Sequence, residues 1–204
     1  MTSPDDDFRL LESKRLLLRA IDPLDAPTVA TVLAIECDPR TWQHLPAMCD
    51  ADLPAKRAAW MGQQADSWAR QGLGWWVIRL TQPVGGLQAG TIVGTGGCGC
   101  RDAKTKAWNL GYRLTPAVWG NGLAGEVAQV AIVAAKQTRP DFPVVARVLT
   151  HNSASWHVLE RVGMQLVWEG DAAADDPLTT GMPRRIYADR SLSPVLLAQL
   201  IALG

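Results

Sequence analysis

The sequence has no excess of charge, because 20 Lys and Arg residues balance 20 Asp and Glu residues in a chain of 204. A neutral chain has no overall field to draw it to nucleic acid or to an anionic membrane. Four cysteines are too few for a disulfide framework at this length. No spacing of His and Cys residues is typical of a zinc site. The sequence therefore predicts neither a nucleic-acid binder nor a metal protein.

Long hydrophobic runs are missing as well. The longest weakly polar runs, 127–135 and 194–204, are much shorter than the roughly 20 residues that a membrane helix needs. The first residues, MTSPDDDF, are acidic, whereas a secretory signal begins with positive charge and an apolar segment. We therefore expect a cytoplasmic protein in a reducing compartment, with no membrane contact.

Hydrophobic periodicity predicts strands that alternate with helices. Strands are expected at 15–21, 75–81, 90–100, 107–114, 143–150, 164–169 and 185–190. Helices are expected after Asp25, over about 54–71, after the loop TPAVWGNG, over 153–161 and over about 194–203. Three consecutive strands with short connections indicate an antiparallel meander. The predicted fold class is α/β (α+β), with a mixed, mostly antiparallel sheet and helices on both faces, in a single domain over 1–204.

Two glycine-rich segments match the pattern G-x-G-x-x-G. No helical pattern follows GTGGCG at 94–99, so we interpret it as a bulged or closely approached strand. GNGLAG at 120–125 follows a strand and opens a helix, as a phosphate-binding loop does. Free amides and the positive end of the helix dipole would bind the anion there. The loop lies within 101–150, where seven bases against three acids give a local charge of +4.

A dinucleotide-binding oxidoreductase is one candidate function for such a loop. A Rossmann unit places an acid at the end of the next strand, to hold the ribose. That position is Thr150-His151-Asn152, which contains no acid. The fingerprint also normally follows the first strand of its domain, whereas a meander precedes this one. The dinucleotide function stays open as an alternative.

Several segments resemble the GNAT superfamily of acyl-CoA-dependent N-acetyltransferases. WGNGLAGEVAQ, directly after WNLGYRLTPAV, is similar to its motif A, Gln/Arg-x-x-Gly-x-Gly/Ala, which falls on Trp119 to Ala124. Trp in the first place is common in the branch of ribosomal-protein N-terminal acetyltransferases and their small-molecule relatives. The segments that resemble this branch are ESKRLLLR at 12–19, TWQHLP at 41–46, GLGWW at 72–76 and HNSASWHVLERVGM at 151–164. The resemblance covers roughly 9–190.

The resemblance implies acetyl-CoA as co-substrate, no metal, and a GNAT fold whose sheet splays at the acyl-CoA site. The strand that ends at Leu114 would offer backbone groups to the pantetheine arm, and Asn152 would bond that arm as well as cap a helix. The pyrophosphate would meet the motif itself. Its residues are Trp119, Gly120, Asn121, Gly122, Leu123 and Ala124.

The implied reaction is direct attack of a primary amine on the thioester, and the leaving thiolate needs a proton donor. Many members place a Tyr seven residues after the Asn, but Leu159 stands there. The ribosomal branch uses a Ser three residues after the Asn. Here that residue is Ser155, which would bind the cofactor and donate the proton.

The base that deprotonates the amine stays open. The family's Glu before Gly-Tyr is replaced by Asn109, which cannot take a proton. Asp175 or Asp176, His151 and a water relay are the candidates. Because the Tyr and the central Glu are both missing, a non-catalytic acyl-CoA-binding module is a further alternative.

The acceptor site implied by the family lies between the loop after the first helix and the late strands. Trp42, Trp75 or Trp76, and Tyr187 are candidates for an aromatic wall that suits an amine or a peptide N-terminus, with core packing as the alternative for each. The acceptor stays open among protein N-termini, aminoglycoside-like amines and amino-acid derivatives. Such folds commonly form homodimers, and the sequence leaves the oligomeric state open.

Overall fold

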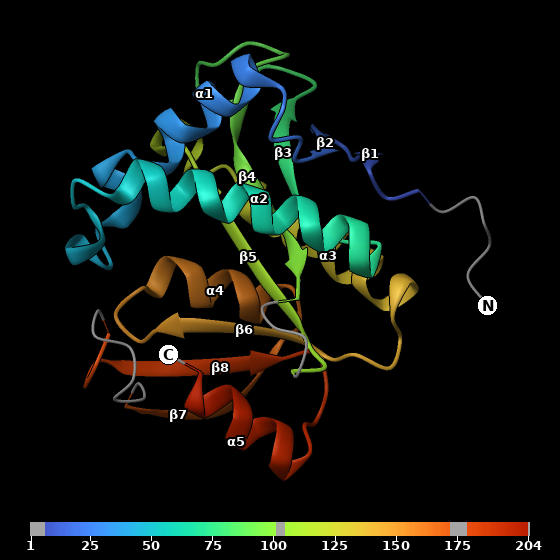
Figure 1. The fold of residues 1–204 in the computed structure, drawn as a ribbon, viewed down its shortest axis with the longest axis vertical. Coiled ribbons are helices and arrows are strands. Elements are labelled where there is room, and N and C mark those ends of the chain that lie inside the picture. The colour runs from blue at the N-terminus through green and yellow to red at the C-terminus, as the bar shows by residue number, and fades with distance from the viewer. Residues whose placement is uncertain (1–6, 101–104, 172–178, 204) are drawn as a thin grey trace.

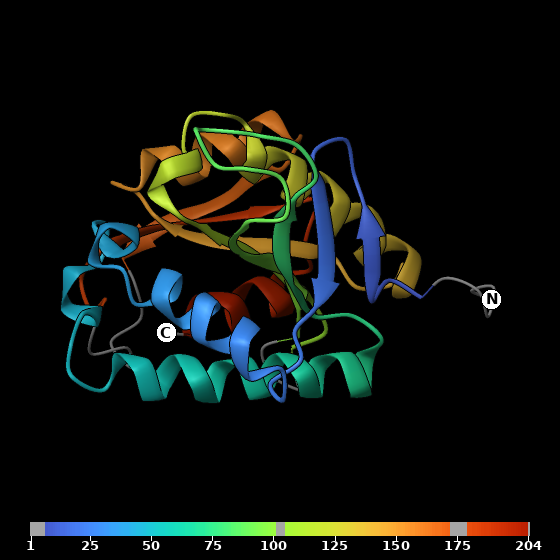
Figure 2. The same cartoon turned by 90° about the horizontal axis from the view of Figure 1, so that it is seen from above.

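The computed structural model describes residues 7–100, 105–171 and 179–203. These residues form one eight-stranded sheet in the order β1-β2-β3-β4-β5-β6-β8-β7, covered by helices on both faces (Figures 1 and 2). The strands are β1 (Leu10–Glu12), β2 (Leu16–Ala20), β3 (Trp75–Leu80), β4 (Ile92–Gly99), β5 (Trp108–Leu114), β6 (Val144–Leu149), β7 (Gln165–Asp171) and β8 (Pro183–Ala188). The α-helices are α1 (Ala26–Glu36), α2 (Leu53–Gln71), α3 (Leu123–Thr138), α4 (Ser153–Arg161) and α5 (Pro194–Ala202).

Every predicted strand and helix is present within a few residues of its predicted bounds, and the predicted fold class is confirmed. The one strand that the sequence did not indicate is β1, which has only three residues and lies at the edge of the sheet beside β2. The short 3-10 helices η1 (Pro39–Trp42) and η2 (Pro46–Met48) interrupt the predicted loop at 37–53.

Local signals explain where several helices begin and end. Asp25 caps α1, because its carboxylate accepts a hydrogen bond from the backbone N–H of Thr28. The side chain of Ser193 caps α5 in the same way, through the N–H of Leu196. At the other end of a helix, α2 stops at Gly72, which has a φ of +75° and forms a left-handed C-cap.

The sheet opens between its two central strands. β5 and β6 run parallel but pair only at Trp108 with Val144 and at Asn109 with Val145. Beyond Asn109, β5 continues to Leu114 and pairs only with β4 among the described residues. Figure 1 shows β5 rising steeply away from β6. The other neighbouring strands pair antiparallel, so the sheet is mixed, mostly antiparallel and splayed, as predicted.

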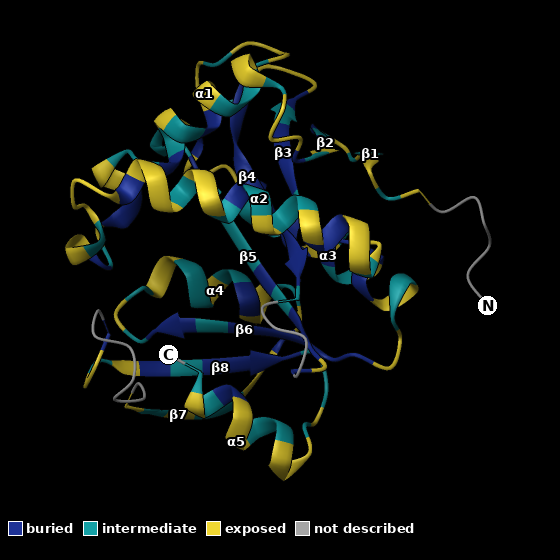
Figure 3. Cartoon of the chain, viewed as in Figure 1, coloured by how far each residue is buried: buried dark blue, intermediate teal, exposed yellow. Residues whose placement is uncertain are grey.

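The helices form two layers. α3 and α4 lie on one face of the sheet, while α1, α2 and α5 lie on the other (Figure 2). The largest core cluster lies under α3 and includes Trp76, Trp108 and Val127. β4 is buried along all eight of its residues, and β6 and β8 are also mostly buried (Figure 3).

The GTGGCG segment lies within β4, in agreement with its interpretation as a closely approached strand. A Cβ at Gly97 would lie 2.6 Å from the carbonyl oxygen of Gly74 and 2.8 Å from the Cα of Trp75. Gly97 also has a φ of +153°, which side chains rarely adopt. Absence of a side chain here lets β3 approach β4.

We expect Gly97→Ala to lower the free energy of unfolding by about 1–3 kcal/mol, because the added methyl group meets backbone atoms that cannot move aside. Urea denaturation would measure the change. Gly62→Ala in α2 is the matched control, since no atom lies within 4 Å of its Cβ position and Ala favours a helix by up to about 1 kcal/mol. Equal effects of the two substitutions would contradict this account of β4.

Candidate active site

The predicted phosphate loop connects β5 to α3 through the 3-10 helix η3 (Pro116–Val118). Gly120 and Gly122 both have a φ of +76°, and no atom lies within 4 Å of a Cβ placed at Gly120. Gly122 is the N-cap of α3 and has no side chain to cap the first amides. The first amides of a helix have no partner within it, and the dipole of this 16-residue helix adds positive potential there. The loop therefore fits an anion that approaches the backbone closely.

The N-terminal segment of the chain holds this loop in place. Arg15 Nη1 donates to the carbonyl of Asn121 at 2.8 Å, and Arg15 Nε lies 2.8 Å from Oε2 of Glu126 in the first turn of α3. Oε1 of Glu126 accepts from Ser13 Oγ at 2.7 Å and from the N–H of Arg15 at 2.8 Å. Burial raises the pKa of Glu126, but the hydrogen bonds from Ser13 and Arg15 outweigh burial and hold that pKa below its ordinary value. The segment 12–19 was expected to belong to a family motif, but its contact with the phosphate loop was not predicted.

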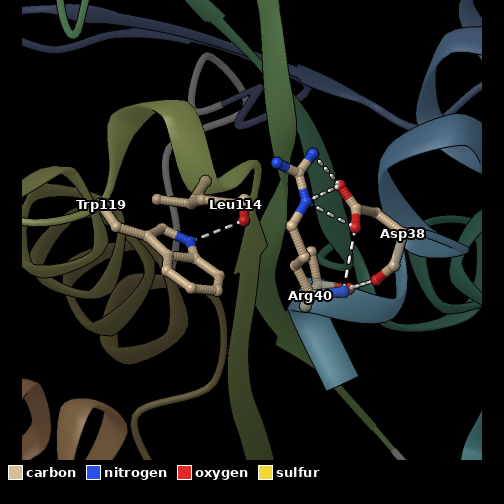
Figure 4. Close-up of polar contacts among 5 residues, drawn as sticks. Asp38, Arg40, Leu114 and Trp119 are labelled. Carbon is tan, nitrogen blue, oxygen red and sulfur yellow. Dashed lines mark hydrogen bonds and ion pairs between the residues drawn. The ribbon is translucent and has the colours of Figure 1, made fainter. Parts of the chain in front are cut away.

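Trp119, the first residue of the predicted motif, is tied to the end of β5. Its indole Nε1 donates to the carbonyl of Leu114 at 2.8 Å, while 47% of the residue stays exposed (Figure 4). One backbone group that was expected to meet the pantetheine arm thus already accepts a hydrogen bond. Figure 4 also shows Asp38, the N-cap of η1, in a bidentate ion pair with Arg40 on the other side of β5.

Ser155 lies against the central strand. The phenol of Tyr112, on β5, donates to the carbonyl of Ser155 at 3.0 Å and lies 3.2 Å from its Oγ. Burial raises the pKa of Tyr112 to about 12, partly offset by its hydrogen bond to Ser155, so the phenol keeps its proton at neutral pH. Tyr112 was not among the predicted site residues, because the acid was expected only on the helix that follows Asn152. A signal was present, since Tyr112 is a polar aromatic in the middle of a predicted strand.

Asn152 occupies the N-cap position of α4, but its side chain makes no capping hydrogen bond. Its carbonyl accepts from the N–H groups of Ser155 and Trp156, at 3.1 and 3.3 Å. The carboxamide is therefore not used by the helix, and the predicted role toward a pantetheine arm stays compatible with its position.

The opposite face of β5 is covered by tryptophan. A Cβ at Gly111 would lie 2.3 Å from Cζ2 of Trp75, so the Trp75 ring occupies the place of a side chain at 111. Trp60, on α2, packs edge-on against Trp75 with ring centroids 4.9 Å apart. Both tryptophans line a cavity of about 600 Å³ beside α2. Other residues that line it include Gln64, Asp66, Ser67, Arg70, Gly99 and Asn109.

The other three aromatic residues predicted for the acceptor wall are buried. Trp42 is 5% exposed, and Trp76 and Tyr187 are fully buried. Their polar atoms bond within the protein: Trp42 Nε1 to the carbonyl of Glu36, Trp76 Nε1 to that of Phe8, and the Tyr187 hydroxyl to Glu160. None of the three offers a surface to an acceptor in this structure, in accord with the alternative of core packing.

A buried ionic cluster anchors the loop 37–53 to the sheet. The carboxylate of Glu36 is fully buried and pairs with Arg57 at 2.7 Å and with Arg113 of β5 at 3.2 Å. Thr95 Oγ1 of β4 donates to Glu36 at 2.5 Å. The Arg113 guanidinium also stacks 3.5 Å above the Trp42 ring. Burial lowers the pKa of Arg113 to about 10, although Glu36 opposes that change, so the guanidinium stays charged.

His151 joins the two sides of the open sheet. Its Nε2 lies 2.7 Å from the carbonyl of His44, 107 residues away. A carbonyl can only accept, so Nε2 carries the proton and Nδ1 of a neutral ring remains as the acceptor. Asp175 and Asp176, the other candidates for the base, lie outside the described residues.

In the described part of the chain, no three His, Cys, Asp or Glu side chains are grouped so that they could hold a metal ion. No helix formed by those residues is both long and apolar enough to cross a membrane.

We expect the imidazole of His44 to titrate near pH 4, because burial, Arg113 and His151 lower its pKa from 6.5 to about 4. Between these values the unfolded chain binds a proton that the folded protein does not, so stability should fall as the pH falls through this window. NMR titration would follow the three histidines, with His44→Gln for assignment. That variant should also lose less stability on acidification. A midpoint near 6.5 would contradict the burial of this ring.

Comparison with known proteins identifies the family. A model described as "Acetyltransferase (GNAT) domain" matches residues 15–165. An acetyltransferase from Agrobacterium tumefaciens has a similar fold, with 23% identity, a TM-score of 0.66, and coverage of 89% of this chain and 94% of that one. RimL, a ribosomal alpha-N-protein acetyltransferase solved with coenzyme A, has 17% identity and a TM-score of 0.65, with coverage of 88% of this chain and 96% of that one. The Microcin C7 self-immunity acetyltransferase MccE, solved with acetyl-CoA and AMP, has 14% identity and a TM-score of 0.63, with coverage of 86% of this chain and 92% of that one.

At these identities the solved structures show the fold, whereas the family model covers most of the chain. The chain belongs to the GNAT family and is an acetyl-CoA-dependent N-acetyltransferase.

Proposed function

We propose that this enzyme transfers the acetyl group of acetyl-CoA directly to a primary amine, on either a protein N-terminus or a small molecule. One observation carries the proposal: the edge of β5 that β6 leaves unpaired extends beyond Asn109 to Leu114, and the open loop at Gly120 and Gly122 follows it. A donor bound there would have Tyr112 and Ser155 on one side and the cavity beside Trp75 on the other.

The donor would bind along β5. Its pyrophosphate would meet the backbone at Gly120 and Gly122 and the first amides of α3, at Leu123 and Ala124. Its pantetheine arm would lie beside the edge of β5 that β6 leaves unpaired. The carboxamide of Asn152, which the helix does not use, would bond the arm from the other side of the gap.

In the reaction, the amine nitrogen attacks the thioester carbon, the C–N bond forms, and the C–S bond breaks. The amine proton goes to a base, for which His151 through Nδ1, Asp176 and a water relay remain the candidates. The thiolate takes a proton from Ser155 Oγ, and water returns to that oxygen the proton that the base took from the amine, so no alkoxide remains. Tyr112, held neutral by burial, keeps Ser155 in place and is itself a donor beside it.

The cavity beside α2 is the proposed acceptor site. Trp60 and Trp75 give it an aromatic wall, and the amides of Gln64 and Asn109 give it neutral hydrogen-bonding groups.

We also propose that the enzyme belongs to the branch of ribosomal-protein N-terminal acetyltransferases, because its motif segments and the Trp at 119 resemble that branch. The family match does not favour a dinucleotide-binding oxidoreductase or a non-catalytic module.

A screen for CoA release tests the proposal. Peptides with free N-termini, polyamines, aminoglycosides and amino acids would each be supplied with acetyl-CoA, with N-acetylated peptides as the control. We expect release with at least one amine and none with the blocked peptides. Binding of acetyl-CoA without release by any amine would favour the acyl-CoA-binding module instead.

Gly122→Val should weaken acetyl-CoA binding at least tenfold, a loss of about 1.4 kcal/mol or more. The branched side chain would stand at the N-cap of α3, in a left-handed backbone conformation that valine disfavours. Calorimetry would measure the affinity. Gly125→Ala, whose Cβ would have no atom within 4 Å, is the control and should bind normally. A folded Gly122→Val protein with wild-type affinity would remove the loop from the site.

Ser155→Ala should lower kcat by roughly 100-fold, because a positioned proton donor contributes about that much. Acetyl-CoA affinity should change by less than about 1.5 kcal/mol, the value of one hydrogen bond. Ser153→Ala, at the start of the same helix, is the control. A kcat within about threefold of wild type would show that the thiolate leaves without Ser155, and an equal loss of binding and rate would make Ser155 a cofactor ligand only.

A further inference from the structure

The phosphate loop is followed by an acidic residue whose negative charge would oppose the binding of an anion. Glu126 places a carboxylate in the first turn of α3, where the proposed anion would bind. Its side chain is only 13% exposed, so solvent screens its charge weakly. An unpaired carboxylate there would repel a phosphate group. The charge must therefore be balanced by a cation from another part of the chain.

Arg15 supplies that cation, and its guanidinium has a donor to spare. Nε pairs with Glu126 and Nη1 donates to the carbonyl of Asn121. Nη2 has no hydrogen-bond partner among the described residues, and it lies 3.7 Å from the Cβ position of Gly122. Two guanidinium nitrogens thus hold the loop while the third faces the glycine at which the anion would approach.

The sequence of the loop makes this donor more important. The motif that it resembles begins with Gln or Arg, whereas this chain has Trp119 there, with its indole bonded to Leu114. The loop therefore lacks the side-chain donor of its own motif. A guanidinium is well suited to replace it, because its planar N–H groups match the oxygens of a phosphate.

We propose that Arg15 is a phosphate ligand for the acyl-CoA donor, bound through Nη2, and that Glu126 moderates its charge. This inference rests on the proposed function, because it assumes that a CoA pyrophosphate occupies the loop. It assigns a binding role to a residue more than 100 positions away from the glycine motif.

Two substitutions that break the same ion pair give opposite predictions. Arg15→Gln should weaken CoA binding about tenfold, because it removes the phosphate donor and leaves Glu126 unbalanced. Glu126→Gln should leave the affinity unchanged or improve it a few-fold, because it frees Arg15 and removes a negative charge. If Arg15 were only a brace for the loop, both variants would bind more weakly. Arg19→Gln, on β2 four residues after Arg15, is the control for loss of one positive charge and should bind normally.

The experiment measures CoA affinity by calorimetry and turnover with two donors, acetyl-CoA and the phosphate-free S-acetylpantetheine. In Arg15→Gln, kcat/KM should fall about tenfold with acetyl-CoA and stay within about twofold with S-acetylpantetheine. If that variant does not fold, Glu126→Gln decides alone: unchanged or tighter CoA binding supports the proposal, and weaker binding overturns it. Absence of CoA binding by the wild-type protein would overturn the proposed function as well. A wild-type protein that binds CoA, with equal losses in the two variants, would overturn the role of Arg15 alone.

Discussion

The site depends on the divergence of β5 from β6. Their backbones pair at only two positions, after which β5 runs on to Leu114 beside β4 alone. Backbone amides and carbonyls inside a protein need partners, so an unpaired strand edge favours any ligand that can act as a further strand. The Trp119 indole already satisfies the carbonyl at the end of this edge. α3 follows β5 and α4 follows β6, so each helix begins after the end of one of the two diverging strands.

Side chains alternate along β5, so the groups proposed to act on the donor and those proposed to bind the acceptor lie on opposite faces of this strand. The Tyr112 side chain points to α4 and contacts Ser155. On the opposite face of β5, Arg113 pairs with Glu36 of α1, and the Trp75 ring of β3 covers Gly111. A slip of one residue would exchange these faces. Gly111 is needed because the Trp75 ring lies where its side chain would be. One strand thus carries the proposed donor side on one face and the proposed acceptor side on the other.

The local features of the fold could be predicted from the sequence because they depend on residues close together in the chain. The cap at Asp25, the stop at Gly72 and the glycine loop before α3 are of this kind. The adjacent tryptophans 75 and 76 face opposite ways, as neighbouring residues on a strand do. Their choice of face could not be predicted, because it depends on which helices cover the sheet. The pairing of Tyr112 with Ser155 joins residues 43 apart, and no local pattern marks it.

The charges near the phosphate loop could not be predicted from the sequence either. The excess of bases in 101–150 suggested a positive environment for the loop, but three of these bases form ion pairs elsewhere in the fold. Arg113 is buried against Glu36 on the opposite face of β5, Arg139 pairs with Asp141, and Lys136 pairs with Asp189. Among the described residues, the guanidinium of Arg15, outside that segment, does contact the loop. Electrostatic potential falls with distance in space rather than along the chain, so a local count of charges cannot say which of them an anion would meet.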